Sequence, residues 1–506
     1  MAILTQVQHE TRRRHAGPKH RRGAAAPAPP AAFQRLPDPE RRRSQAPMNL
    51  RKPAILSLLR ASGSGVPDEL ALIGRIERSA ERIAEVQRTR LAALLRHAWS
   101  QVPYYREVLD SCGAVRDGRV NLDRFTDIPF LTKDVMRAEG DRLRAGTLPP
   151  GRKAHRNASG GSTGEPVQFW QDNGYWDTTI AVRTYHFSTV GKQLGEREMK
   201  IWGNERDLFE GTLGWKATLQ NWVYNRRFEQ CWHLPEAQIR KILHDIDQWK
   251  PKLLWCYRDG IDAVAKYVLE HGLRPHAPAA IVLGGATVYP WMVEVIERAF
   301  GSPAISAYGS REVGAVACQC LERAGHHIAT HSNVVETIDA DGRPVVGQEG
   351  ELAITPLTNY AMPFLRYRIG DRGKLGTDRC ACGRGYPVLE SISGRMIEVL
   401  VNSRGEQVDP IYFIQLLSVI FNRGLVRKFQ VVQDEDGALT LNAVLEAHAT
   451  REAFQANLVE VLDKIRLVMG ADCPIEVKFV DDIPLSASGK HPYVVRRGSL
   501  RPPTPA

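Results

Sequence analysis

The chain has 506 residues, of which 43% are hydrophobic and 25% charged, as is typical of globular proteins with two or three domains. No apolar run is long enough to cross a bilayer, so we do not expect an integral membrane protein. The net charge is +11, but residues 1–47 hold ten Lys and Arg against three Asp and Glu, which leaves only +4 for the rest. Because residues 48–506 are only mildly basic, we do not expect nucleic acid as a partner.

Residues 1–47 are rich in Ala, Pro and Arg and have too little apolar surface to order themselves. We therefore expect a disordered basic tail without a secretory signal. An Arg-rich transit peptide, a basic docking tail, or a translation start at Met48 are the alternatives.

Residues 73–99 carry apolar side chains at helical spacing, which predicts one or two amphipathic packing helices. Further on, Thr132 is placed to cap a helix that begins at Lys133. Neither segment carries chemistry by itself.

From residue 181 to residue 308 helical and strand patterns alternate, which predicts an α/β fold with a largely parallel sheet. The expected strands are 199–202, 253–255, 280–283 and 304–308, and the expected helices are 181–190, 236–249, 263–269 and 290–300. Ligands of such sheets bind at the carboxyl ends of strands. We expect the loops 284–287 and 309–312, which leave strands at such places, to face one crevice.

Short strands with turn signals replace this alternation from residue 334 onward. The predicted fold class is α/β: a large N-terminal domain (48–393) with mixed or parallel sheets, helices and a β-rich subdomain at about 330–393, then a small α+β C-terminal domain (394–506).

The segment from Asn157 to Pro166 consists mostly of small and hydroxylated residues. Its glycines leave backbone amides bare and its Ser and Thr side chains add hydroxyls, which together suit several anionic oxygens. It is not a Walker motif, because a strand rather than a helix is predicted at 167–170. The pattern fits a phosphate cradle, and taken alone it also fits an ordinary hairpin turn.

Five motifs follow one another along the chain. They read Ser-Gly-Gly-Ser-Thr-Gly (159–164), Tyr-Gly-Ser-Arg-Glu (308–312), Tyr-Arg-Ile-Gly-Asp (367–371), Ser-Gly-Arg (393–395) and Ser-Gly-Lys (488–490). In this order and spacing they resemble the core motifs of the adenylate-forming superfamily, which includes acyl-CoA synthetases. Residues 102–106 and 128–133 resemble the phenylacetate–CoA ligase branch with its CapK-type relatives of capsular polysaccharide biosynthesis.

This resemblance implies a site for ATP. The loop that would hold the β- and γ-phosphates consists of Ser159, Gly160, Gly161, Ser162, Thr163 and Gly164. The adenine would lie against Gly284, Gly285 and Ala286, with Tyr308, Gly309 and Ser310 beside it. Tyr308 would stack on the base, and its alternative is a core aromatic residue.

The resemblance also implies the charged residues of the reaction. Glu312 would ligate Mg²⁺, and Asp371 would accept the ribose hydroxyls unless it is only a turn aspartate. Lys490 would stabilise the charge that develops as the carboxylate meets the α-phosphate, and Arg395 matches the hinge of a mobile C-terminal domain. Arg311 stands where relatives have Thr or Ser at the α-phosphate, so it would bind phosphate or block the site.

Eight cysteines are too few for a disulfide scaffold in so long a chain, which favours a reducing, cytoplasmic setting. Four residues have the composition of a closed structural zinc site, namely Cys320, His327, Cys380 and Cys382. Ordinary buried thiols are the alternative, and Cys318, His326 and His331 are alternative ligands. A similar set occurs in this branch of the family.

The resemblance thus implies an ATP- and Mg²⁺-dependent ligase that activates a small carboxylic acid as an acyl-adenylate and passes it to coenzyme A. One alternative transfers the acyl group to an amine or hydroxyl in capsule or glycan synthesis. A second alternative is a nucleotide-binding scaffold that has lost catalysis, which Arg311 suggests.

Overall fold

The computed structural model describes residues 49–158, 167–202, 215–231, 234–395, 400–404, 407–408, 413, 417, 425–484 and 491–497. The predicted N-terminal tail lies outside this range. Among the described residues, no helix is both long enough and apolar enough to cross a membrane.

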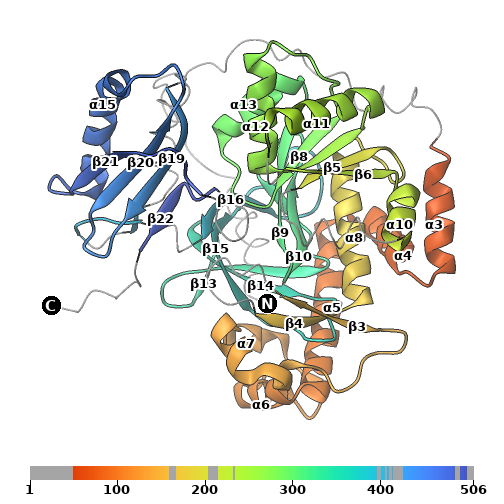
Figure 1. Cartoon of the computed structure of the whole chain (residues 1–506). Coiled ribbons are helices and arrows are strands. Elements are labelled where there is room, and N and C mark those ends of the chain that lie inside the picture. The colour runs from red at the N-terminus through yellow and green to blue at the C-terminus, as the bar shows by residue number, and fades with distance from the viewer. Residues whose placement is uncertain are drawn as a thin grey trace, which may run out of the picture.

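Four helices open the described chain and are labelled in Figure 1. They are α3 (Arg51–Ala61), α4 (Val66–Ile76), α5 (Ala80–Gln101) and α6 (Pro103–Cys112). Ser79 caps α5 by accepting a hydrogen bond from the backbone of Arg82, and the predicted apolar stripe of α5 is buried. Thr132 caps α7 (Lys133–Glu139) as predicted.

The central sheet has twelve strands in the order β13-β12-β14-β15-β16-β11-β10-β9-β8-β7-β5-β6. Its parallel half comprises β5 (Glu198–Trp202), β6 (Arg226–Gln230), β7 (Leu253–Tyr257), β8 (Ala280–Gly284) and β9 (Ala304–Ser310). The helices of this half are α8 (Asn173–Thr189), α10 (Trp215–Tyr224), α11 (Glu236–Trp249), α12 (Arg258–Glu270) and α13 (Pro290–Phe300). The predicted alternation of helix and strand is confirmed.

Several elements differ from the sequence predictions, among them α10, which was not predicted, and α12, which begins at Arg258 rather than at 263. The edge strand β6 was not predicted, because two arginines and a glutamate interrupt its apolar pattern. Helix α8 begins at Asn173 rather than 181, since Asp172 caps it by accepting a hydrogen bond from the backbone of Tyr175 at 3.0 Å.

The antiparallel half continues the same sheet rather than forming a separate one. It comprises β10 (Gly314–Gln319), β11 (His326–Ile328), β12 (Asn333–Ile338), β13 (Pro344–Val345), β14 (Glu349–Pro356), β15 (Tyr367–Leu375) and β16 (Val388–Arg395). Strand β11 joins the halves, because it pairs with β10 on one side and with β16 on the other.

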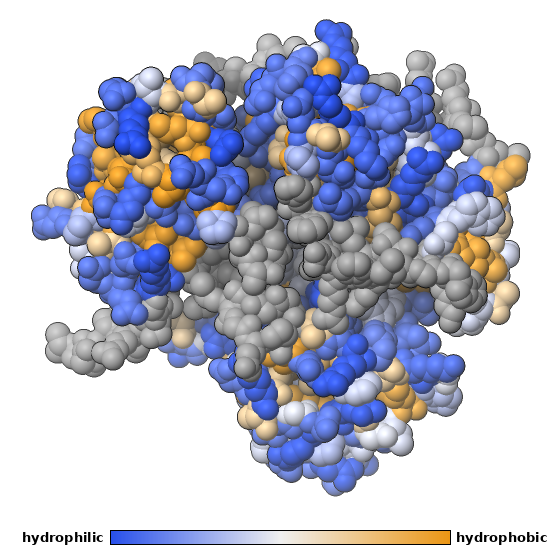
Figure 2. All heavy atoms as spheres, viewed as in Figure 1, coloured by the Kyte–Doolittle hydropathy of each residue, from blue (hydrophilic) through white to orange (hydrophobic). Residues whose placement is uncertain are grey.

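The C-terminal unit has its own sheet in the order β21-β20-β19-β22, with helix α15 (Arg451–Met469). The strands are β19 (Val426–Gln433), β20 (Leu439–Leu445), β21 (Ile475–Phe479) and β22 (Val494–Arg496), and the unit lies to one side of the large sheet (Figure 1). Figure 2 shows apolar side chains on its visible face. The mixture of helix and strand agrees with the predicted α+β pattern.

Short elements complete the fold. They are β1 (Val115–Arg116), β2 (Arg119–Val120), η2 (Leu122–Asp127), η3 (Gly140–Leu143), β3 (Ala154–Ala158), β4 (Gln168–Asp172), β17 (Leu400–Val401) and β18 (Gln407–Val408). Strands β3 and β4 pair in antiparallel fashion, so the glycine-rich segment 159–166 connects the two arms of a hairpin. The segment itself lies outside the described residues, including all six residues predicted to hold phosphates.

Candidate active site

A tight hairpin between β9 and β10 presents Arg311 and Glu312 at its turn. Gly309 is required there, because a Cβ at this position would overlap the carbonyl oxygen of Gly314. Gly314 has a φ of +72°, and a Cβ on it would lie 2.6 Å from the Thr179 hydroxyl of α8. The turn is therefore held closely against the first turns of α8.

Hydrogen bonds connect this turn to the arms of the glycine-rich hairpin. The buried Gln171 of β4 donates to the carbonyl oxygen of Arg311 at 2.7 Å. It also accepts a hydrogen bond from the Asn157 amide of β3 at 2.9 Å. Both arms of the predicted phosphate loop are thus fixed beside the Arg311–Glu312 turn, which sequence spacing does not reveal.

Glu312 is 8% exposed, and its carboxylate has no hydrogen bond or ion pair with any residue in the described ranges. Its backbone is fixed instead, since its N–H donates to the Ser310 hydroxyl and its carbonyl accepts from Tyr175. Burial raises the pKa of Tyr175, and the nearby Glu312 charge raises it further. A buried carboxylate with its oxygens unpaired fits the hard ligand that Mg²⁺ requires.

Tyr308 and Asp371 lie together although 63 positions separate them. The Tyr308 hydroxyl on β9 donates to Oδ2 of Asp371 on β15 at 2.8 Å. Asp371 is in register with Arg395, the last residue of the neighbouring strand β16. The side chain of Arg395 lies outside the described residues. The predicted base-stacking and ribose-binding residues are therefore neighbours.

The loop after β8 adjoins the same edge of the sheet. Gly285 has a φ of +87°, and a Cβ on it would overlap the ring of Tyr257 at the end of β7. A Cβ at Gly284 would lie 3.7 Å from the carbonyl oxygen of Ala307, next to Tyr308. The loop after β8 therefore lies beside the end of β9, at the carboxyl ends of parallel strands, where sheets of this kind bind ligands.

An aromatic group lines the α8 face of the sheet near these loops. The rings of Trp202 and Trp255 lie 5.2 Å apart, and Lys200 Nζ lies 4.6 and 4.4 Å from their centroids. Arg183 of α8 covers Trp255 at 4.6 Å. Sequence spacing does not bring these two cations together, because Arg183 lies in a helix and Lys200 in a strand.

Two other tryptophans of the 202–255 segment, Trp222 and Trp249, lie outside this group. Trp222 is exposed and Trp249 packs beneath Arg227, whereas the side chains of Trp215 and Trp232 lie outside the described residues.

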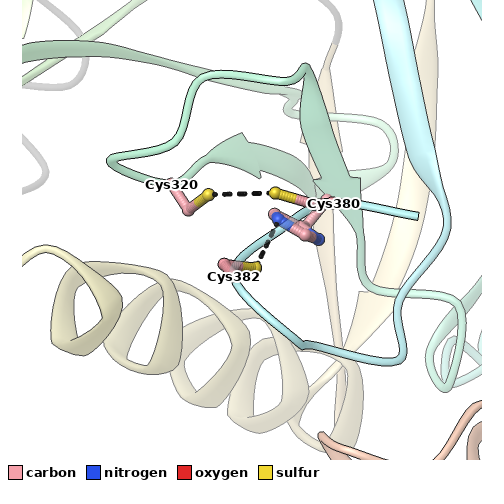
Figure 3. A group of neighbouring side chains, drawn as sticks. Cys320, Cys380 and Cys382 are labelled. Atoms are coloured by element: carbon pink, nitrogen blue, oxygen red, sulfur yellow. Dashed lines mark hydrogen bonds between the residues drawn. The ribbon is translucent and has the colours of Figure 1, made fainter. Parts of the chain in front are cut away.

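Cys320, His327, Cys380 and Cys382 form a compact cluster whose ligand atoms all lie within 4.8 Å of one another (Figure 3). The sulfurs of Cys320 and Cys380 are 3.6 Å apart, and Cys382 Sγ lies 3.3 Å from His327 Nε2. Tetrahedral ligands at about 2.3 Å from a zinc ion would be separated by roughly 3.8 Å. The donor set and its spacing therefore fit a structural zinc ion.

The alternative ligands lie elsewhere. Cys318 packs in a core cluster with Phe187, and His331 lies between Glu69 and Tyr386. Burial lowers the pKa of His326 to about 4, and its ring nitrogens have no hydrogen-bond partner in the described structure.

The chain is similar in sequence to known proteins over most of its length. Residues 400–497 match the family model described as the CapK C-terminal domain. The chain is 27% identical over 394 residues to a phenylacetate–CoA ligase of Thermus thermophilus, covering 76% of this chain and 85% of that protein. It is 21% identical over 425 residues to Protein CapK of Staphylococcus aureus, covering 83% and 90% of the two chains.

The fold is similar to that of 2-hydroxyisobutyryl-CoA ligase. In its postadenylation state that enzyme superposes with a TM-score of 0.68 at 19% identity, covering 84% of this chain and 91% of that one. In its thioesterification state the TM-score is 0.53. The chain is therefore similar over most of its length to phenylacetate–CoA ligases and to Protein CapK, and it shares the fold of an acyl-CoA ligase.

Proposed function

We propose that the protein joins a carboxylic acid to AMP and then transfers the acyl group to coenzyme A. The observation that carries this proposal is the convergence of three features at one edge of the sheet. Gln171 on the β4 arm of the glycine-rich hairpin is hydrogen-bonded to the Arg311 carbonyl, Asn157 on the β3 arm is bonded to Gln171, and Tyr308, which holds Asp371 of β15, lies on β9, the strand that leads into the turn.

In the first step a carboxylate oxygen would attack the α-phosphate, and the bond to the β-phosphate would break to release pyrophosphate. The bare amides of residues 159–164 would hold the phosphates that leave. Mg²⁺ on Glu312 would offset their charge, while Arg311 would lie near the α-phosphate.

The nucleoside would lie between residues 284–286 and Tyr308. Asp371, oriented by the Tyr308 hydroxyl, would accept the ribose hydroxyls. In the second step the sulfur of coenzyme A would attack the acyl carbonyl and AMP would leave.

The CapK-type C-terminal domain favours a second candidate acceptor. In this version the acyl-adenylate forms in the same way, but an amine or hydroxyl of a capsule or glycan precursor attacks it in place of the thiol.

The domain boundaries follow from the same proposal. Residues 48–393 would form the adenylating domain, and residues 394–506 a mobile domain that carries Lys490. Two facts support this division: β16 ends at Arg395, and the match to the CapK domain begins at residue 400.

We further propose that Cys320, His327, Cys380 and Cys382 hold a structural zinc ion. It would join the segment after β10 to the loop before β16, at the junction of the two halves of the sheet. All eight cysteines are free thiols, which suits a reducing compartment such as the cytoplasm.

Acid-dependent exchange of labelled pyrophosphate into ATP tests the proposed function. With a panel of aryl, fatty and hydroxy acids, we expect exchange with at least one class. Exchange accompanied by consumption of coenzyme A supports the first acceptor, and exchange without it supports the second. ATP binding with no exchange for any acid would instead indicate a nucleotide-binding scaffold.

Tyr308→Phe is expected to raise the KM for ATP about tenfold, because Asp371 loses the hydrogen bond that orients it. The rate at saturating ATP should change less. Steady-state exchange kinetics measure both values, with Tyr185→Phe as a control that removes a hydroxyl bonded to Glu77 far from the crevice. An unchanged KM would contradict the role given to the pair.

A further inference from the structure

The end of the described chain returns to the large unit at the start of α12. Residue 491 directly follows Lys490, and the His491 N–H donates to Oδ2 of Asp259 at 3.4 Å. The His491 ring is buried and bonds through Nε2 to the carbonyl oxygen of Phe429 at 2.9 Å. The residue after the predicted catalytic lysine is thus held from both units.

Arg258, next to Asp259, is 3% exposed and forms the centre of this contact. Its guanidinium donates to Oδ1 of Asp259 at 2.9 Å and to the carbonyl oxygen of Thr287, which follows the predicted adenine loop. It also lies 5.3 Å from the ring centroids of both Tyr289 and Tyr493. One cation therefore connects the loop after β8 with the C-terminal unit.

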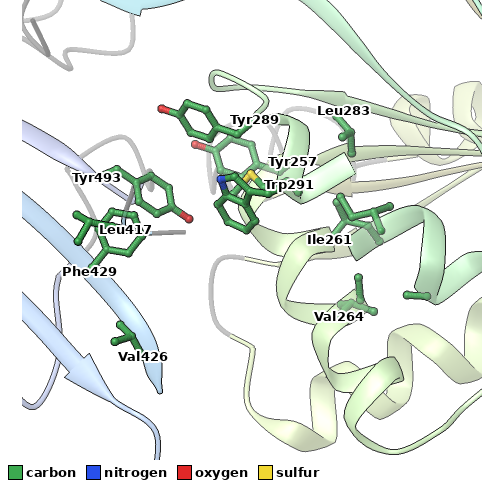
Figure 4. Packing of buried hydrophobic residues seen from close by; sticks show 14 of the residues in the cluster. Tyr257, Ile261, Val264, Leu283, Tyr289, Trp291, Leu417, Val426, Phe429 and Tyr493 are labelled. Carbon is green, nitrogen blue, oxygen red and sulfur yellow. The ribbon is translucent and has the colours of Figure 1, made fainter. Parts of the chain in front are cut away.

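Aromatic side chains of both units also pack together here, and Figure 4 shows Tyr493 facing Tyr289 and Trp291. Tyr493 meets Tyr289 edge-on with centroids 5.9 Å apart, and it meets Trp291 at 6.4 Å. On its other side Tyr493 contacts Phe429 at 5.2 Å. These side chains belong to one buried cluster that spans both units.

We propose that Arg258 and Asp259 form a docking site that positions Lys490 for adenylation. The inference rests on the proposed function. Because one peptide bond separates Lys490 from the anchored His491, the anchor restricts where the lysine can reach. The contact must break when the C-terminal unit turns for the second step, so it stabilises the adenylating arrangement selectively.

Asp259→Asn tests the docking site, since it keeps the shape of the side chain and removes its charge. We expect pyrophosphate exchange to fall about tenfold, because a charge-assisted hydrogen bond to the anchor is weakened. Formation of the thioester from supplied acyl-adenylate and coenzyme A should be unchanged or faster. Asp259→Glu should restore part of the exchange rate.

Glu236→Gln is the matched control. It breaks an ion pair of the same unit, with Arg240, that makes no contact with residues 491–497, and it should leave both half-reactions unchanged. If Asp259→Asn slows both half-reactions equally, Asp259 has only a structural role and the proposal is overturned. Pyrophosphate exchange that is unchanged in Asp259→Asn would also overturn it.

Hydrogen–deuterium exchange separates this proposal from the proposed function. Asp259→Asn should speed amide exchange in residues 491–497, whether or not any acid is activated. If the unchanged protein activates no acid but amide deuterium exchange in residues 491–497 is faster in the variant, the proposed function fails and the docking contact stands. Equal rates of amide deuterium exchange in the unchanged protein and in Asp259→Asn would overturn the docking contact itself.

Discussion

Replacing Lys490 with alanine is expected to lower acid-dependent pyrophosphate exchange about 10²–10³-fold while leaving ATP binding nearly unchanged. The reaction brings a carboxylate against a phosphate, so a cation at the point of attack stabilises charge that exists only in the transition state. In the proposed function ATP is held mainly by residues of the large unit, which the substitution does not change. Exchange kinetics and calorimetric ATP titration measure the two effects.

Lys478→Ala is the matched control for this substitution. Lys478 lies on β21 of the same unit, is half exposed and pairs only with Glu476 among the described residues. It should leave exchange within twofold of the unchanged protein, since surface ion pairs contribute little. Retained exchange in Lys490→Ala would contradict the role given to Lys490.

Loss of Cys382, a ligand of the proposed zinc ion, is expected to produce the largest effect on stability. Metal binding at a structural site contributes directly to folding free energy. Cys382→Ser should therefore release the metal and lower Tm by on the order of 10 °C. Elemental analysis of the purified protein gives the metal content, and calorimetry gives Tm.

Cys112→Ser controls for the loss of a thiol, because Cys112 lies at the end of α6 outside the cluster. It should keep one metal per chain. The zinc site would be contradicted if the unchanged protein held less than one metal ion per chain and Cys382→Ser did not lower that content.

Much of the fold could be predicted because its signals are local. The parallel strands β7 and β8 are short apolar runs, and Thr132 and Lys133 mark the start of α7 through capping chemistry. Strand β6 could not be predicted, since an edge strand buries little and tolerates Arg227 and Glu229.

The candidate site, like the fold, could be predicted from the sequence only in part. Its residues were found from motifs, but their contacts depend on the fold: Tyr308 and Asp371 meet across strands that are not neighbours in the sheet. The bond from Gln171 to the Arg311 carbonyl joins segments 140 positions apart. Arg258 belongs to no motif, and only its burial between two tyrosines reveals it.

The choice of cysteines also required the structure. Sequence left Cys318 and Cys320 as competing ligands, because they lie two positions apart. Cys318 belongs to β10 and enters the core, whereas Cys320 follows the strand and turns toward Cys380.

Tracing a carboxylate oxygen tests the central claim most directly. The acid found by the exchange assay is labelled with ¹⁸O in its carboxylate, and the products of one complete turnover are analysed by mass spectrometry. If the carboxylate attacks the α-phosphate, AMP carries one labelled oxygen and pyrophosphate carries none. Label in inorganic phosphate together with ADP, or AMP without label, would contradict an acyl-adenylate.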